Sequence, residues 1–495
     1  ASRYTPSSTL QRMELLKTGY MGTLSLGWDN YLFLELTGRQ ERSSTLKDQS
    51  FFYPSANLSF LFTQAFHMPS WWNYGKLRLS YGIVGNAPET YTANIVYEQG
   101  SDNGFTWNTI PSSWGNADIR PEKKYEYEIG LESKFLNNRL GIDISYYNNR
   151  VKDQILSTPQ PSTSGVKNVL MNVGEVANRG WDISISATPI LTRDFRWDLT
   201  ANYGVYKNKV VKLADGVPYL EILNSGGSGI KIQAVEGQPM GDIYAQVPQV
   251  NENGEYLVSD KGLYLNQTEL QKVGNINPAG VGGLFNSFSY KNVFLDFSID
   301  FRIGGDVINE MNQYATAVGL TPESLKYRDT EHGGLSYYYP GDNNSSGIPV
   351  QVDPSTGAGP NGEIIYHDGI ILPGVVASTG ERNTRIIPAG YYYNTTYNWG
   401  TEAEQLTYRH SVFDNSYVKL RELTIGYQFP EKMISKLGLG RLSVSVFGRN
   451  LFYFYKALKN YDAESSVGTS WANQATVGSS TTATRSFGVS LRASF

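Results

Sequence analysis

The residue types that most often carry catalysis or bind metals are sparse in this chain. Its four histidines are scattered, at His67, His332, His367 and His410. Cysteine is absent, which excludes disulfides and thiolate metal ligands within the chain. No HExxH, P-loop or GxSxG motif is present. We therefore expect no enzyme activity, no metal site and no cofactor.

One pair of carboxylates could imitate an active site. Glu126 and Glu128 are candidates for the acid and base of a glycosidase, which needs two carboxyl groups close together. Their i,i+2 spacing places both on one face of an extended strand. This arrangement suits the wall of a water-filled channel better than a catalytic pair.

The strand that would hold this pair belongs to a pattern that recurs along the chain. In the final stretch, RSFGVSLRASF, apolar residues alternate with Ser, Gly and Arg. The same alternation occurs in YMGTLSLGW, KLRLSYGI, YEYEIGLE, LGIDISYY and VFLDFSIDF. Successive side chains of a strand point to opposite faces, so each stretch predicts a strand with one apolar and one polar face.

We expect thirteen such strands, each of about 8–12 residues, the length needed to cross a bilayer at a tilt. Their centres lie near residues 24, 35, 60, 79, 129, 144, 184, 200, 285, 298, 422, 446 and 490. Short connections alternate with long loops, which we expect near 40–55, 84–122, 151–178, 206–279, 304–414 and 453–483. Short turns at one end and long loops at the other are typical of outer-membrane barrels, with the long loops extracellular.

Composition supports a membrane barrel over a soluble sandwich or propeller. Charged residues such as Glu128, Asp182 and Asp300 fall on the polar faces, and Trp28 and Trp181 lie near strand ends, as in an aromatic girdle. No apolar run of about 18 residues occurs, so no transmembrane helix is expected. The net charge of -4, without a basic stripe, gives no reason to expect nucleic-acid binding.

Several stretches, taken in order, resemble the SusC-like TonB-dependent transporters of Bacteroidetes. They are IRPEKKYEYEIGLESKFLNNRLGIDISYY, NVGEVANRGWDISI, EGQPMGDIYA, VGNINPAGVGGLFNSFSYKNVFLDFSIDF, ERNTRIIPAGYYY, NSYVKLRELTIGYQFP, GRNLFYF and TATRSFGVSLRASF. The resemblance implies an all-β fold, a transmembrane antiparallel β-barrel of 22 strands with an N-terminal plug inside it. It also implies an outer-membrane importer of an oligosaccharide or peptide, working with a SusD-like surface lipoprotein and energised by TonB.

Thirteen strands would not close such a barrel, and open edges in lipid would leave backbone groups unpaired. We therefore expect residues 1–495 to be the C-terminal portion of the barrel. The plug and the N-terminal strands would be separate from this chain. Those N-terminal strands would pair with its first and last strands.

Two stretches depart from the pattern of the family. After RNLF the family often has a Tyr-Asp-Pro-Glu-like run, which here reads Tyr-Asp-Ala-Glu at 461–464. Many members carry an acidic, calcium-like loop where this chain has NENGEYLVSDKG. Only Asn251, Asn253 and Glu255 could contribute oxygen ligands at its start, too few for an EF-hand-like site. We expect a tight turn at Asn253-Gly254 instead.

The resemblance also assigns a role to the end of the chain. In such proteins the last strand, ending in an aromatic residue, is read by the barrel-assembly machinery and then closes the barrel. The corresponding signal here would be Phe487, Val489, Leu491 and Phe495.

The long loops hold the aromatic residues that could stack on a sugar or pack against a peptide side chain. The candidates for substrate binding are Trp107, Trp114, Tyr338, Tyr392, Trp399 and Trp471. Such residues could equally pack on one another or on a capping partner. A passive porin, a siderophore or cobalamin receptor, and a barrel-anchored adhesin remain as alternative functions, and the sequence does not identify the substrate.

Overall fold

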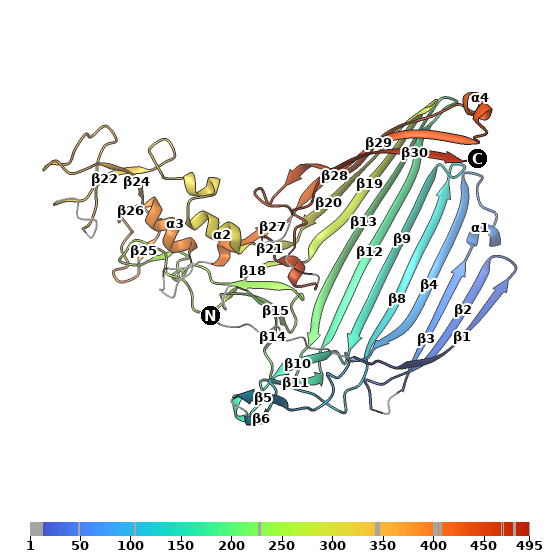
Figure 1. Ribbon diagram of the computed structural model, residues 1–495, viewed down its shortest axis with the longest axis horizontal. Helices are drawn as coiled ribbons and strands as arrows, with labels where there is room; N and C mark the ends of the chain where they lie inside the picture. The colour runs from blue at the N-terminus through green and yellow to red at the C-terminus, as the bar shows by residue number, and fades with distance from the viewer. Residues whose placement is uncertain are drawn as a thin grey trace.

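A single large antiparallel sheet dominates the computed structural model (Figure 1). The structure describes residues 13–47, 50–102, 105–225, 229–341, 347–398, 404, 408–466, 468, 470–478 and 482–494. Within these residues the large sheet has thirteen strands. Their order across the sheet is their order along the chain, so each pairs with the sheet strands that come just before and just after it. The all-β fold and the expected strand-by-strand order are therefore confirmed.

All strands are numbered along the chain, including the short strands in the connections, so the labels of the thirteen strands are not consecutive. Their bounds are β1 (Lys17–Trp28), β2 (Leu32–Ser43), β3 (Ser50–Phe60), β4 (Trp72–Asn86), β8 (Glu122–Phe135), β9 (Leu140–Lys152), β12 (Glu175–Leu191), β13 (Phe195–Lys212), β19 (Pro278–Tyr290), β20 (Val293–Gly304), β28 (Tyr417–Gln428), β29 (Arg441–Lys456) and β30 (Ser486–Ser494).

The pairing register joins the apolar faces of the separate strands into one surface. Leu79 lies opposite Ile129, Ile129 opposite Tyr146, and Tyr146 opposite Trp181. At the far end of the sheet, Val446 lies opposite Val489. We call this surface the outer face and the opposite, polar surface the inner face. The predicted alternation is thus correct in register as well as within each strand.

Short connections gather at one end of the sheet (Figure 1). Asp29 and Asn30 join β1 to β2 with φ of 47° and 58°, which suits a tight hairpin turn. Lys291, also at positive φ, lies in the turn between β19 and β20. The two longer connections at this end hold the short helices α1 (Phe62–Ala65) and α4 (Glu431–Ile434), the latter followed by η5 (Ser435–Leu437). Among the described residues, no helix is both long and apolar enough to cross a membrane.

Long connections gather at the other end and carry their own secondary structure. Segment 87–121 holds β5 (Glu98–Asp102), β6 (Phe105–Thr109) and β7 (Ser113–Trp114), and segment 153–174 holds β10 (Ile155–Pro159), η1 (Ser162–Ser164) and β11 (Asn168–Asn172). Segment 213–277 holds β14 (Tyr219–Ser225), β15 (Ile230–Val235), β16 (Asp242–Ala245), β17 (Leu257–Val258) and β18 (Gln271–Asn275).

The remaining long connections follow β20 and β29. Segment 305–416 holds β21 (Asp306–Ile308), α2 (Glu310–Ala317), η3 (Pro322–Leu325), β22 (Leu335–Tyr338), β23 (Val350–Gln351), β24 (Tyr366–Ile370), β25 (Val375–Val376), β26 (Ile387–Pro388), α3 (Ala389–Tyr397), η4 (Tyr408–Ser411) and β27 (Val412–Asp414). Segment 457–485 holds η6 (Asn473–Ala475).

One expected loop is largely strand. The stretch 40–55 was expected to be a long connection, yet β2 continues to Ser43 and β3 begins at Ser50, so only residues 44–49 connect them. The expected strand centred near residue 60 likewise ends at Phe60. β2 extends past the apolar band into the polar run 39–43, whose composition resembles that of a loop. β3 begins with an aromatic run and has Pro54 within it, which is unusual for a strand. The backbone ladder nevertheless continues, and Arg42 still lies opposite Ser50.

Buried apolar clusters lie mainly in the long segments, because the sheet itself has no second layer. In the largest cluster, Ile232 and Ile243 from 213–277 pack with Ile308 and Val412 from 305–416 and with Ala475 from 457–485. Three connections that are far apart in sequence therefore share one apolar core at the end of the sheet where the long segments gather.

The NENGEYLVSDKG stretch forms the expected turn. The Asn251 side-chain Oδ1 accepts from the backbone N–H groups of Asn253 and Glu255, at 3.0 and 2.9 Å. Gly254 has φ of +80° and donates its N–H to the Asn251 carbonyl. The Asn251 side chain is thus used to hold the backbone turn.

A matched pair of substitutions tests the two faces of the sheet. We expect Ile183→Arg, on the outer face of β12, to lower the free energy of unfolding by about 2–4 kcal/mol, because the new charge would enter hydrocarbon. Ser184→Arg introduces the same side chain on the inner face, opposite Asp143, and should cost less than about 1 kcal/mol. Denaturant titration of the protein folded into liposomes measures both. Equal losses would show that the faces are wrongly assigned.

Candidate functional site

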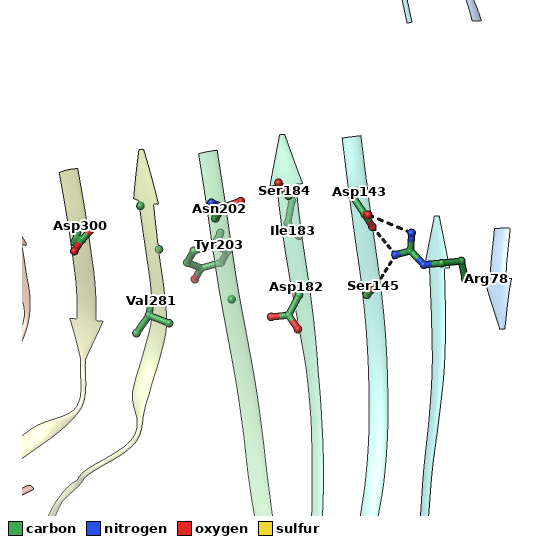
Figure 2. Close-up of a pocket in the computed structure, with 13 residues that line it drawn as sticks. Arg78, Asp143, Ser145, Asp182, Ile183, Ser184, Asn202, Tyr203, Val281 and Asp300 are labelled. Carbon is green, nitrogen blue, oxygen red and sulfur yellow. Dashed lines mark hydrogen bonds and ion pairs between the residues drawn. The ribbon is translucent and has the colours of Figure 1, made fainter. Parts of the chain in front are cut away.

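The inner face of the sheet has a hollow of about 640 Å³ across β4, β9, β12, β13, β19 and β20 (Figure 2). Its floor consists of small residues: Ser145, Ser184, Gly204 and Gly283 lie on adjacent strands. Small side chains leave room above the backbone, which is why the wall is recessed there. This recess is a place where a molecule inside the sheet's curve could contact the wall.

Carboxylates border this hollow. Asp143 is held by Arg78, whose Nη2 lies 2.6 Å from Asp143 Oδ1 (Figure 2). Asp182 lines the hollow too, and no Lys, Arg or His nitrogen of the described residues lies within 4.0 Å of its carboxylate. The hollow can therefore attract a cationic or hydrogen-bond-donating group, but it contains no nucleophile–base pair of the kind that hydrolysis requires.

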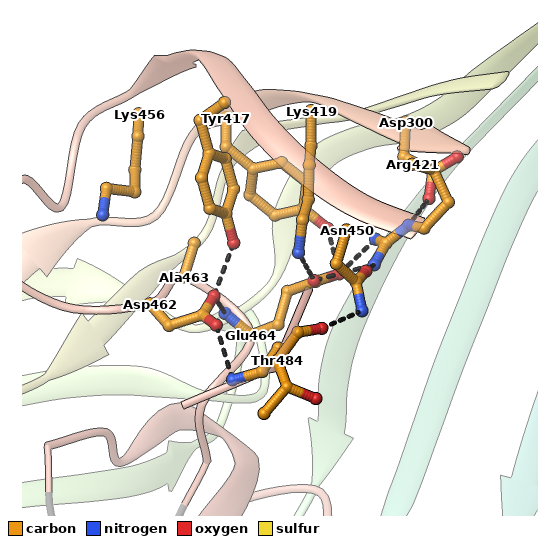
Figure 3. A network of polar contacts seen from close by, with 12 residues as sticks. Asp300, Tyr417, Lys419, Arg421, Asn450, Lys456, Asp462, Ala463, Glu464 and Thr484 are labelled. Atoms are coloured by element: carbon orange, nitrogen blue, oxygen red, sulfur yellow. Dashed lines mark hydrogen bonds and ion pairs between the residues drawn. The ribbon is translucent and has the colours of Figure 1, made fainter. Parts of the chain in front are cut away.

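A second polar site joins segment 457–485 to the inner face of β28 (Figure 3). Glu464 Oε2 accepts from Lys419 Nζ at 2.5 Å and from Arg421 Nη1 at 2.9 Å. Arg421 in turn donates from Nε to Asp300 of β20 at 2.5 Å and from Nη1 to Asn450 of β29 at 2.9 Å. One carboxylate of the connection is thereby tied to three neighbouring strands.

The residues around Glu464 complete this anchor. Asp462 accepts a hydrogen bond from the Tyr453 hydroxyl at 2.5 Å and from the Ala483 N–H at 2.9 Å. The carbonyl of Ala463 accepts from Asn415 at 2.9 Å. The Tyr-Asp-Ala-Glu run, noted in the sequence only as a departure from a family pattern, therefore attaches segment 457–485 to the inner face of the sheet. We call residues 461–464 the anchor run.

The charge state of Glu464 follows from these contacts. Burial by itself would raise the pKa of this carboxyl, but hydrogen bonds from Arg421 and Lys419 outweigh burial and lower its pKa to about 2. Glu464 is therefore ionised at neutral pH. Lys419 is almost fully covered, with 2% of its side chain exposed, so Glu464 is its counter-charge in a poorly solvated place.

A second hollow, of about 420 Å³, lies among tyrosines of the long segments. Tyr264, Tyr327, Tyr392 and Tyr393 line it. The rings of Tyr392 and Tyr393 have centroids 5.0 Å apart in an edge-to-face arrangement. Burial raises the pKa of Tyr392 to about 12, so its hydroxyl stays protonated at neutral pH.

The predicted substrate-binding residues are distributed over different elements. Trp107 lies on the β5–β6 hairpin, 46% exposed and opposite Gly100, whereas Tyr338 lies on β22 and Tyr392 on α3. Figure 1 shows the hairpin at the bottom of the view and β22 at its left edge, so these residues do not form one cluster.

The remaining candidates also lie apart. Trp114 is on β7 with its ring 6.1 Å from that of Tyr97, and Trp471 lies beside Gly241. Trp399 is outside the described residues. Direct contact of any of the six candidates with substrate stays a prediction.

The residues of the expected assembly signal that the structure describes share one face. Phe487, Val489 and Leu491 lie on the outer face of β30, opposite Gly448, Val446 and Val444, and they are 73%, 71% and 68% exposed. Phe495 lies outside the described residues. Their role in assembly remains a prediction.

Glu464→Gln should weaken the attachment of the anchor run. Gln keeps the shape but loses the charge, and Lys419 is left buried without its counter-ion, at a cost of about 3 kcal/mol. We expect faster hydrogen–deuterium exchange at the N–H groups of Glu464 and Ala483. Glu323→Gln is the control, because Glu323 pairs with Lys326 at 2.8 Å on the exposed surface and should contribute less than about 1 kcal/mol.

The same exchange measurement has a predicted pH dependence. Because the pKa of Glu464 is lowered on folding, its contribution is complete well above the ordinary glutamate pKa of about 4.3 and is lost as the pH falls toward 2. Exchange that is unchanged in Glu464→Gln would contradict the anchor. So would protection factors, which correct for the intrinsic pH dependence of amide exchange, that stay constant across this range in the native protein.

Comparison with known proteins agrees with this architecture. A model of the family described as TonB-dependent receptor-like, β-barrel, matches residues 3–229. TonB-dependent receptor P3 of Formosa agariphila is 24% identical over 91% of this chain. TonB-dependent receptor SusC of Bacteroides thetaiotaomicron is 30% identical over 46% of this chain.

Solved structures show the same fold. The RagAB peptide importer in its open-open state superposes with a TM-score of 0.68 at 18% identity, covering 97% of this chain and 47% of that chain. This chain spans 42% of the length of the receptor P3 and 24% of that of SusC. Residues 3–229 match the TonB-dependent receptor-like β-barrel family, and the chain is similar to SusC-like proteins of the Gram-negative outer membrane.

Proposed function

We propose that this chain forms part of an outer-membrane importer that takes up an oligomeric nutrient with energy delivered through TonB. The observation that carries the proposal is the sidedness of the sheet. One face is apolar, the other is polar and recessed, and all the long segments gather at one end. A polar inner wall offers a path through the membrane, and long segments at its mouth can select what enters it.

A peptide is the favoured nutrient class, with an oligosaccharide as the alternative. RagAB, which shares this fold, is a peptide importer. The borders of the inner hollow favour polar cargo, since Asp182 can pair with an amino group or accept from an amide or hydroxyl. The resemblance to SusC-like transporters disfavours the siderophore alternative.

We further propose three partners. A SusD-like lipoprotein would cover the long segments, the N-terminal barrel and plug portion would complete the channel, and TonB would act through that plug. These partners follow from the resemblance to SusC-like transporters. The exposed aromatic residues of the long segments, Trp107 among them, give the lipoprotein an apolar contact surface.

Uptake by the whole transporter tests the inner path. We expect Ser184→Trp to lower the uptake of a labelled oligopeptide mixture by at least about tenfold, because the indole would fill the hollow in the wall. Ile183→Trp is the matched control, since it places the same side chain one residue away on the lipid-facing side, where an aromatic residue is compatible with lipid. An uncoupler should stop uptake by the native protein.

The outcomes separate the alternatives. Uptake that survives the uncoupler would indicate a passive porin. An equal loss in both tryptophan variants would show that the inner hollow does not lie on the path. Uptake of oligosaccharides but not oligopeptides would overturn the favoured nutrient class while leaving the importer intact.

Site-specific photo-crosslinking tests the lipoprotein partner. A photoreactive residue at position 107, on the exposed β5–β6 hairpin, should crosslink to a surface lipoprotein in cells. The same residue at position 489, on the outer face of β30, should not, because that position faces lipid or a neighbouring strand. Failure of position 107 and of the other long-segment positions to capture a lipoprotein would contradict this partner.

A further inference from the structure

The outer face carries a compact group of cations where four adjacent strands approach the long segments. Register places Lys152 opposite Lys123, and Arg179 opposite Lys207, all on the lipid-facing side of the sheet. Arg150 and Lys209 flank Ala177 in the row between them. We define the outer basic patch as Lys123, Arg150, Lys152, Arg179, Lys207 and Lys209.

Most of this positive charge lacks a protein partner. Arg150 pairs with Glu175 at 3.0 Å. No carboxylate oxygen of the described residues lies within 4.0 Å of the side-chain nitrogens of the other five, although Lys152 lies over the Tyr125 ring at 5.9 Å. The chain as a whole has a net charge of -4, so the patch does not reflect a generally basic composition. Close cations of this kind repel one another unless an external anion lies among them.

The position of the patch relative to the apolar band indicates where that anion would be. The row Ile129–Tyr146–Trp181–Val205 is apolar, and the next row toward the long segments contains Arg179 and Lys207. Successive rows are about 7 Å apart along the strands. The cations therefore begin one row beyond the apolar band, at the level of lipid head groups.

The patch is also local. It lies on β8, β9, β12 and β13, which have β4 on one side and β19 on the other, so closure of the sheet at its edges would not cover it. At the same end of the sheet, the outer face of β20 and β28 is apolar, with Phe301, Ile303 and Val418. A general attraction to a negatively charged surface would not require the cations to concentrate on four strands.

We propose that the outer basic patch binds the phosphate groups of a phosphorylated glycolipid in the outer leaflet. Long extracellular loops mark the outer surface, so the patch faces that leaflet. Lys and Arg stems can lie along the apolar band while their charged ends reach phosphate oxygens. Arg179 can bind a phosphate through two parallel hydrogen bonds, and the surrounding lysines add point charges.

Native mass spectrometry of the whole transporter with added lipid A tests this inference. We expect lipid adducts on the native protein and far fewer with dephosphorylated lipid A of the same acyl chains. Lys207→Gln with Lys209→Gln should lower lipid A binding about 25-fold, because each cation near a charged membrane surface is worth about fivefold in affinity. Resistance of the folded variant to detergent unfolding before heating verifies that the barrel is intact.

Lys124→Gln is the matched control. Lys124 neighbours Lys123 on β8 but points to the inner face, where it pairs with Glu126 at 2.5 Å. It should leave lipid A binding unchanged. Equal binding of dephosphorylated lipid A, an equal loss in Lys124→Gln, or adducts formed just as well with inorganic phosphate alone would each overturn the assignment.

Discussion

The structure depends on one constraint: in hydrocarbon, every backbone N–H and C=O must find its partner within the protein. An antiparallel ladder meets this demand strand by strand, and here it runs without interruption from β1 to β30 within the described residues. The two-residue alternation follows from this. The side chains on one face of the sheet must suit lipid, and those on the opposite face are exposed to water. Because the pairing register joins the apolar residues of neighbouring strands on the outer face, it also joins their polar residues on the inner face.

Where the chain leaves the hydrocarbon, the constraint relaxes and other interactions determine the structure. The long segments build small apolar cores of their own, such as the one that joins Ile232, Ile308 and Ala475. They also need attachment to the sheet, and the anchor run provides it by placing Glu464 between Lys419 and Arg421. Cations then occupy both sides of the sheet near this end. Lys419 and Arg421 inside are neutralised by Glu464, whereas the cations of the outer basic patch face the head groups.

Much of the sheet could be predicted from the sequence, because alternation is local. A stretch such as YEYEIGLE shows its two faces without any knowledge of its neighbours, and the turn at Asp29–Asn30 follows from residues that accept positive φ. The limits of β2 and β3 could not be read in this way, since the end of β2 is polar like a loop and β3 contains Pro54 near its start. The anchor run was visible only as a sequence departure, because its partners Lys419 and Arg421 lie more than forty residues away. The outer basic patch was missed for the same reason, since its cations come together only through the register of four strands.

The central claim is that the sheet separates lipid from a watery, substrate-accessible interior, and β12 tests it most directly. The chain contains no cysteine, so single cysteines introduced along residues 179–187 are unique within it. In the whole transporter, thiols at even-numbered positions should react with a water-soluble, membrane-impermeant maleimide. Fluorophores at odd-numbered positions should instead be quenched by quenchers attached to lipid. A two-residue period with this phase supports the account, and uniform reactivity or the opposite phase would contradict it.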